Sequence, residues 1–371
     1  MNMILTARPF RACAGSCLLL MMAQGAAFAA QQPGAEDAPR LVNSEREPQA
    51  ATGGLGATLE AIARRSGPAW IGYSAARVAG QGSLCCGNHD DGEGCGTCRL
   101  EGENQRVTGT GNDPVKLEGG HRLVVLLRLE GHKVTRIAVA SEDCTLDAGG
   151  LHVVWLSNVD AGESVTVLSG YVLGAPFAER RHDDLGGQAL TAIALHADAA
   201  ADRALASFTA PQQSEELRKK ASFWLGEARG AAGLAMLRSM AKNDPSGEVR
   251  AQVTFALSVS REPGALDEMI RMAREDGSGQ VRGQALFWLS QKAGKRALGA
   301  ISGAIADDPE TDVKKKAVFA LSQLPKDEGV PKLIEVATSN RNAEVRKQAM
   351  FWLGQSNDPR ALDFFAKVLA Q

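Results

Sequence analysis

One stretch of this chain recurs every 32 residues, with no insertion between its copies. Each copy opens with leucine or valine followed by arginine or lysine, and carries alanine or valine four positions on and leucine eight positions on. The clearest copies begin at Leu217, Val249, Val281, Val313 and Val345. A fixed period of this length is typical of a solenoid, in which each unit buries its apolar face by stacking on its neighbours.

A sixth, weaker copy begins at Leu185 and keeps the hydrophobic positions while losing the aromatic ones. Positions 0, 4 and 8 of every copy fall on one side of an α-helix, so they predict the buried side of a first helix in each unit. The core positions expected in the second helices are Leu205, Leu237, Met269, Ile301, Leu333 and Phe365. We therefore predict six α-hairpins over residues 180–371, the first of which caps the array against the preceding domain.

The first 29 residues have the features of a signal peptide. Arg8 and Arg11 are their only charges, an apolar run follows over Cys17–Met22, and Ala27–Ala29 provides a small-x-small cleavage site. The run is shorter than the ~18 apolar residues that a membrane span needs. We therefore expect cleavage after Ala29, a periplasmic or secreted location, and no membrane span once the signal is removed.

Residues 55–175 predict a small, mainly antiparallel β domain with a helix at each end. Strand-like segments flank residues 130–132, which is typical of a β-hairpin, and a second hairpin is expected from residues 144–147 and 151–156. The flanking helices are expected from Leu55 and after Asp160. Residues 30–54 are polar and contain three prolines, so we interpret them as a flexible linker. The predicted fold class is α+β multidomain, with a C-terminal α-solenoid.

Five cysteines remain after the signal peptide. In an exported chain disulfides are the default, and an odd number leaves at least one cysteine outside intrachain pairing. We interpret all five as candidates for structural disulfides around a long glycine-rich loop, with the pairing open. They are Cys85, Cys86, Cys95, Cys98 and Cys144.

A zinc site, with or without His89, and a redox pair at Cys95 and Cys98 are the alternatives for this loop. Adjacent cysteines suit a tetrahedral zinc site poorly, and a redox motif of this type should open a helix after a strand. We therefore expect no metal site here, although both alternatives stay open.

The repeated pattern Val-Arg-x-x-Ala-x-x-x-Leu-Gly/Ser, with Asp-Pro turns before several copies, resembles HEAT-type repeats of the short HEAT-like class. The resemblance covers about residues 185–371. Together with the signal peptide and the β domain, the arrangement resembles exported bacterial proteins that contain HEAT repeats. That resemblance implies a protein-interaction scaffold. Some short HEAT-like proteins also resemble bilin lyases, so a lyase-type enzyme is an alternative.

Phe-Trp pairs occur at residues 223–224, 287–288 and 351–352, and Phe-Ala takes their place in the units between. These residues are either a ladder that stacks a ligand or a packing device, and we favour packing because position 7 adjoins the core positions on the helix. Binding is then expected on the opposite side of the same helix, which the HEAT resemblance places on the concave side. The candidate binding residues are Lys219, Ser222, Lys315, Val318, Lys347 and Met350.

A cation follows the first residue of units two to six, although cations oppose the helix dipole at this end. We therefore expect each to pair with an acid of the adjacent unit. The chain has 41 basic and 43 acidic side chains, so no excess of positive charge favours a nucleic-acid partner.

No catalytic motif is recognisable, and we expect neither a catalytic residue nor a cofactor. The sequence therefore predicts an exported scaffold that binds a protein or peptide on the concave face of the repeat array. The alternatives are a HEAT-like lyase or a redox or metal-binding protein that uses the loop from Cys85 to Cys98.

Overall fold

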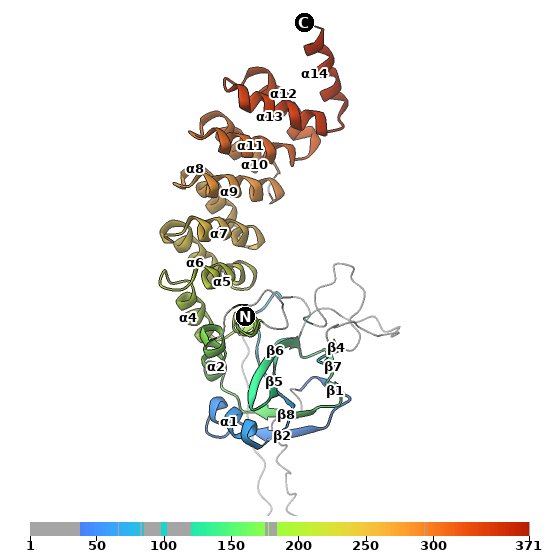
Figure 1. The fold of residues 1–371 in the computed structure, drawn as a ribbon, viewed down its shortest axis with the longest axis vertical. Coiled ribbons are helices and arrows are strands. Elements are labelled where there is room, and N and C mark those ends of the chain that lie inside the picture. The colour runs from blue at the N-terminus through green and yellow to red at the C-terminus, as the bar shows by residue number, and fades with distance from the viewer. Residues whose placement is uncertain are drawn as a thin grey trace, which may run out of the picture. The chain divides into compact units, whose positions relative to one another are not determined.

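The structure is a computed structural model that describes residues 38–65, 67–81, 84, 98–101, 120–174, 177, 184–292 and 294–370. All of these belong to one compact unit, residues 34–371. They form an α+β protein in which a mixed-sheet domain precedes a solenoid of helix pairs (Figure 1). The predicted signal peptide lies outside the described residues.

The larger sheet has five strands in the order β2-β8-β3-β5-β6. Strands β5 (Arg122–Glu130) and β6 (Lys133–Ser141) form the predicted antiparallel hairpin, and β5 also pairs antiparallel with β3 (Ala69–Ala76). Strand β8 (His152–Ser157) runs parallel to both β3 and β2 (Arg46–Ala50). The prediction of a mainly antiparallel domain is therefore wrong, because half of this sheet is parallel.

The smaller sheet consists of three short parallel strands in the order β1-β7-β4. They are β1 (Arg40–Val42), β7 (Thr145–Asp147) and β4 (Cys98–Arg99). The predicted second hairpin is wrong. The chain does turn at Gly149 and Gly150, which have positive φ angles of 65° and 86°, but the turn carries it from one sheet into the other.

Residues 40–50, which the sequence analysis assigned to a flexible linker, form the strands β1 and β2. Both strands lie at sheet edges and none of their residues is buried, so they lack the alternation of apolar and polar residues that marks a half-buried strand. Their parallel pairing with β7 and β8 provides the backbone hydrogen bonds that order them.

Both faces of the larger sheet are covered. Helices α1 (Leu55–Arg65) and α2 (Ala161–Gly174) share one hydrophobic cluster with the side chains on one face, such as Val125. The smaller sheet covers the other face, where Leu126 and Leu146 are buried together. A strand buried on both faces reads as a continuous hydrophobic run, which accounts for the sequence of β5.

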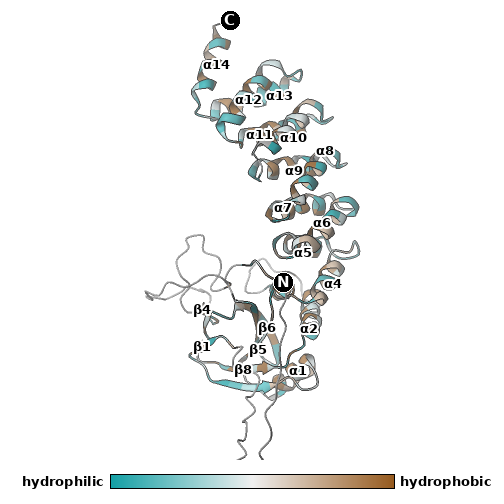
Figure 2. Ribbon diagram, turned by 180° about the vertical axis from the view of Figure 1, so that it is seen from behind, coloured by the Kyte–Doolittle hydropathy of each residue, from teal (hydrophilic) through white to brown (hydrophobic). Residues whose placement is uncertain are grey.

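The solenoid has six helix pairs within the described residues from 184 to 370, as predicted. The first helix of each unit packs along the first helix of the unit that follows it. Each helix carries both hydrophilic and hydrophobic residues (Figure 2). The first helices are α3 (Leu185–Leu195), α5 (Glu215–Ala228), α7 (Gly247–Val259), α9 (Gly279–Lys292), α11 (Thr311–Ser322) and α13 (Ala343–Gln355). The second helices are α4 (Ala199–Phe208), α6 (Gly230–Asn243), α8 (Gly264–Glu275), α10 (Gly294–Asp307), α12 (Lys326–Ser339) and α14 (Pro359–Leu369).

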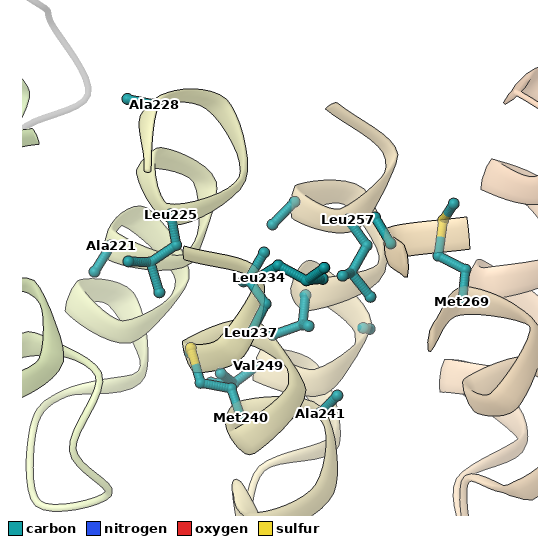
Figure 3. Packing of buried hydrophobic residues seen from close by; sticks show 14 of the residues in the cluster. Ala221, Leu225, Ala228, Leu234, Leu237, Met240, Ala241, Val249, Leu257 and Met269 are labelled. Atoms are coloured by element: carbon teal, nitrogen blue, oxygen red, sulfur yellow. The ribbon is translucent and has the colours of Figure 1, made fainter. Parts of the chain in front are cut away.

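Positions 0, 4 and 8 form the core of the array, as the period predicts. Leu225, Val249 and Leu257 occupy such positions and are buried together with Leu237 of the second helix α6 (Figure 3). The first unit caps the array against the β domain, because α3 packs on both β6 and α2. In the part of the chain that the structure describes, no helix is long and apolar enough to cross a membrane.

Arginines at position 1 form a series of ion pairs along the array, which we call the arginine ladder: Arg218, Arg250 and Arg282. Each makes two hydrogen bonds to an aspartate just before the next unit, and these aspartates are Asp244, Asp276 and Asp308. Such paired guanidinium–carboxylate contacts fix geometry as well as adding energy. The ladder ends at the fifth unit, where Lys314 donates to the Ala306 carbonyl oxygen.

Candidate functional site

A groove of about 1180 Å³ lies between the β domain and the first repeat units. One wall is the outer edge of β6, residues 136–140, together with β4 and Leu100. The opposite wall is formed by α3, α5 and α7, which contribute Gln188, Lys219 and Phe255 among others. The groove therefore forms only where the first unit packs on β6, and neither domain alone would contain it.

Aromatic side chains run from this groove along the first helices of five units, and we call them the aromatic stripe. Phe223 stacks on Phe255 with ring centroids 5.9 Å apart, and Phe255 meets Trp288 at 4.8 Å. The same two contacts recur one pair of units further on, at 6.1 Å and 4.9 Å. The stripe consists of Phe223, Trp224, Phe255, Phe287, Trp288, Phe319, Phe351 and Trp352.

The stripe is neither fully buried nor fully exposed. Its tryptophans pack against the edge of the core, and within the described structure the indole Nε1 atoms of Trp288 and Trp352 are buried without a hydrogen-bond partner. Phe351, at the far end, is 54% exposed. Packing, which the sequence analysis favoured, thus accounts for the tryptophans, whereas the phenylalanines lie at the surface.

Two of the six predicted binding residues are buried, so those two predictions are wrong. Ser222 and Val318 have no exposed surface. The reason is that positions 5 and 9 face the first helix of the next unit. At Gly226, in position 9, a methyl group would overlap the Ala256 carbonyl oxygen of α7. Each first helix therefore has a second packed side, which does not contain positions 0, 4 and 8.

The remaining four predicted residues are partly or fully exposed, but the structure brings only Lys219 to the groove. Lys315 lies on α11, where its Nζ contacts Asp312 at 3.3 Å, and Lys347 and Met350 lie on α13. The Lys219 carbonyl oxygen accepts from the Ser222 hydroxyl, but among the described residues the Lys219 ammonium group has no ion-pair or hydrogen-bond partner. Lys219 is thus the candidate cation for a ligand in the groove.

The surface position of the phenylalanines was not predicted, although the sequence contains the signal for it. An α-helix advances about 100° per residue, so position 6 lies about 160° from position 4, the centre of the core side. The β6 wall had no comparable signal, because only the strand order shows that β6 is an edge.

Several other charged side chains of the groove are engaged in contacts that hold its walls. Lys220 pairs with Asp184 at 3.0 Å and lies over the Phe177 ring at 4.5 Å, and Asp184 also caps α3 by accepting from the Gly187 N–H. On the opposite wall the Arg136 guanidinium lies over the Trp70 ring at 5.1 Å. These contacts leave the groove a mixture of apolar surface and fixed charges.

Cys98 and Cys144 are each disulfide-bonded. Cys85, Cys86, Cys95 and His89 lie outside the described residues, so the pairing of the five cysteines stays a prediction. Among the residues that the structure describes, no group of three or more His, Cys, Asp or Glu side chains could hold a metal ion.

A buried polar chain joins the β domain to the first unit. The Tyr73 hydroxyl lies 2.7 Å from Ser164 Oγ, which lies 2.9 Å from His196 Nε2. The other ring nitrogen, Nδ1, lies 2.7 Å from the Ala192 carbonyl oxygen, so it carries the proton and Nε2 accepts from Ser164. Burial lowers the pKa of His196 and raises that of Tyr73. These hydrogen bonds connect β3, α2 and the end of α3. All three side chains are closed to solvent, so they do not offer a reaction site.

A family model described as HEAT repeats matches residues 201–290 and 300–371. The matched region begins in α4 and extends to the end of the solenoid. No curated protein sequence matches the chain. The C-terminal region is a solenoid of HEAT repeats.

Several solved structures are similar to the chain. The complex of CpcE and CpcF of phycocyanin lyase from Nostoc sp. PCC7120 is 23% identical, over 42% of this chain and 99% of that chain, with a TM-score of 0.33. Human deoxyhypusine hydroxylase in complex with glycerol is 19% identical, over 57% and 79%, with a TM-score of 0.29. A Kap121p mutant is 15% identical, over 51% and 25%, with a TM-score of 0.32. At these identities and TM-scores the similarities say nothing about the activity of this chain.

Proposed function

We propose that this chain is an exported scaffold that binds a protein or peptide partner in the groove between β6 and the first repeat units. The observation that carries the proposal is that the aromatic stripe starts inside this groove, at Phe223, Trp224 and Phe255. Half-buried aromatic side chains are typical of surfaces that bind proteins, and the Lys219 ammonium group beside them offers a charge for an acidic group of the partner. The stripe then offers further contact area along the array.

Export is part of the same proposal. It is supported by the signal-peptide features of residues 1–29 and by the disulfide-bonded state of Cys98 and Cys144, because disulfides persist in oxidising compartments. Expression of the full chain with a signal-trap reporter tests it. Appearance of a shortened, exported product supports export, and retention of the full-length chain in the cytoplasm contradicts it.

The binding proposal is tested with a phage-displayed library of random peptides selected on the purified protein. The affinity of the selected peptide is then compared between the wild type and two variants with the same change of charge. Lys219→Glu alters the groove, whereas Lys242→Glu alters an exposed lysine on α6, on the second helix of the same unit.

We expect Lys219→Glu to weaken binding about tenfold, which corresponds to about 1.4 kcal/mol, and Lys242→Glu to leave it unchanged. Phe255→Ala, which removes one ring from the groove, should weaken binding by a similar factor. If both groove variants bind as the wild type does, the groove is not the binding site.

A further inference from the structure

Strand β6 is an edge of the larger sheet, and its free side forms a wall of the groove. An edge strand presents a row of backbone N–H and C=O groups that can pair with another chain. At the opposite edge, β2, Pro48 and the charges of Arg46 and Glu47 disfavour pairing with another strand. In contrast, residues 137–140 of β6 are uncharged and contain no proline.

The direction of the β6 backbone groups follows from one hydrogen bond. Ile137 N–H donates to Gln188 Oε1 of α3 at 2.6 Å, so it points away from β5. In an antiparallel pair the N–H and C=O of one residue point to the same side, and residues two apart share that side. The Ile137 C=O and both backbone groups of Val139 therefore also point into the groove. Within the described structure none of these three groups has a partner.

The groove has the dimensions for a peptide rather than a small molecule. Its volume of about 1180 Å³ exceeds the roughly 300–1,000 Å³ that is usual for small-molecule pockets. It also follows β6 over five consecutive residues, Arg136–Ala140. A strand added at the usual spacing of about 4.8 Å would be about 17 Å long over these five residues.

We propose that the groove takes an extended peptide segment as a sixth strand of the larger sheet, paired through the backbone groups of Val139 and the Ile137 C=O. This inference rests on the proposed function and names its mode of recognition, β-strand addition. Side chains of the added strand alternate between two environments. On one face they meet Phe223 and Lys219 of α5, and on the other they meet Leu100 beside β4. The segment that fits is therefore apolar, with an acidic side chain on the face toward Lys219.

Gln188 sets one end of the added strand. Its side-chain oxygen already accepts from the Ile137 N–H, as the carbonyl of a paired strand would. The free groups begin immediately after this contact, at the Ile137 C=O. The ladder of the added strand thus starts there and continues through Val139.

The test uses the peptide selected on the wild-type protein from the random library. Val139→Pro removes the free N–H without removing a hydrogen bond to β5, and proline is tolerated at such an edge position. Val139→Ala is the matched control, because it shortens the side chain and keeps the N–H. We expect Val139→Pro to weaken binding at least tenfold and Val139→Ala to change it no more than about twofold.

A second measurement leaves the protein unaltered. Single N-methyl groups are placed at successive positions of the same peptide, and the affinity of each is measured. Strand addition predicts that every second N-methyl group abolishes binding and that those between do not, because only alternate N–H groups point to β6.

The outcomes separate the two proposals. A peptide whose binding depends on Lys219 but tolerates Val139→Pro, or shows no alternation in the N-methyl series, overturns strand addition and leaves the groove as a binding site. A library that gives no peptide binding to the wild type overturns both.

Discussion

Arg250 and Asp276 form a doubly hydrogen-bonded ion pair between the start of one repeat unit and the turn that leads into the next. Nε lies 2.9 Å from Oδ2, and Nη2 lies 3.0 Å from Oδ1. Burial raises the pKa of Asp276, but the hydrogen bonds from Arg250 and from the Ser278 N–H outweigh it and lower the pKa below its ordinary value. A cation at a helix start, where the dipole does not favour it, predicted a pair with an acid of the adjacent unit. The acid is instead in the turn that ends the same unit.

Removing Arg250 should destabilise the solenoid, because it leaves the Asp276 carboxylate buried without its counter-charge. We expect Arg250→Ala to lower the free energy of unfolding by about 3 kcal/mol. Arg274→Ala, an exposed arginine of the same unit, should change it by less than about 0.5 kcal/mol. Urea denaturation followed by circular dichroism measures both. Equal effects of the two substitutions contradict a structural role for the ladder.

The stability of the chain should depend on pH through His196. Because burial lowers its pKa in the folded state, the unfolded chain binds more protons than the folded one below about pH 6.5. The contribution of neutral His196 is therefore fully present above about pH 6.5 and is lost as the pH falls toward the lowered pKa. Asp198 and Arg229 are the charged groups that act on this imidazole.

Urea denaturation at a series of pH values between 7 and 5 tests this dependence. His196→Gln should lower stability at pH 7 and flatten the slope, because glutamine does not titrate. His121→Gln, at an exposed histidine, serves as the control and should keep the wild-type slope. An unchanged slope in His196→Gln contradicts the assignment.

Two glycines in the same repeat position should respond in opposite ways to alanine. A methyl group at Gly226 would overlap the backbone of α7, whereas at Gly354 no atom lies within 4 Å. We expect Gly226→Ala to destabilise the protein by about 1–3 kcal/mol through overpacking. Gly354→Ala should be neutral or stabilise it by up to about 1 kcal/mol, since alanine is the better helix former. Thermal unfolding of both variants distinguishes a close-packed interface from a simple helix-propensity effect.

The repeat array could be predicted well because the same spacing of hydrophobic residues recurs in every unit. Val249 and Leu257 lie four residues either side of Val253, and six copies of this spacing determine which side of the helix is buried. The surface was predicted less well. Ser222 and Val318 are small or apolar residues on a second packed side, which appears only when one unit is stacked on the next.

The β domain shows a different limit. Its hairpin of β5 and β6 is local in sequence, so residues 130–132 predicted it. The pairing of β2 with β8 joins residues about a hundred positions apart, and the residue pattern of neither strand indicates which strand it pairs with. The free edge of β6 is a consequence of that strand order. For this reason the groove could not be found before the structure.

Amide hydrogen exchange at Val139 tests the central claim most directly. In the free protein the Val139 N–H has no acceptor among the described residues, so it should exchange readily, whereas the Ala138 N–H, which points to β5, should be protected. Adding the selected peptide to the purified protein should slow exchange at Val139 at least tenfold and leave Lys133, at the start of β6, unchanged. Unaltered exchange at Val139 in the presence of saturating peptide would contradict binding on the β6 edge.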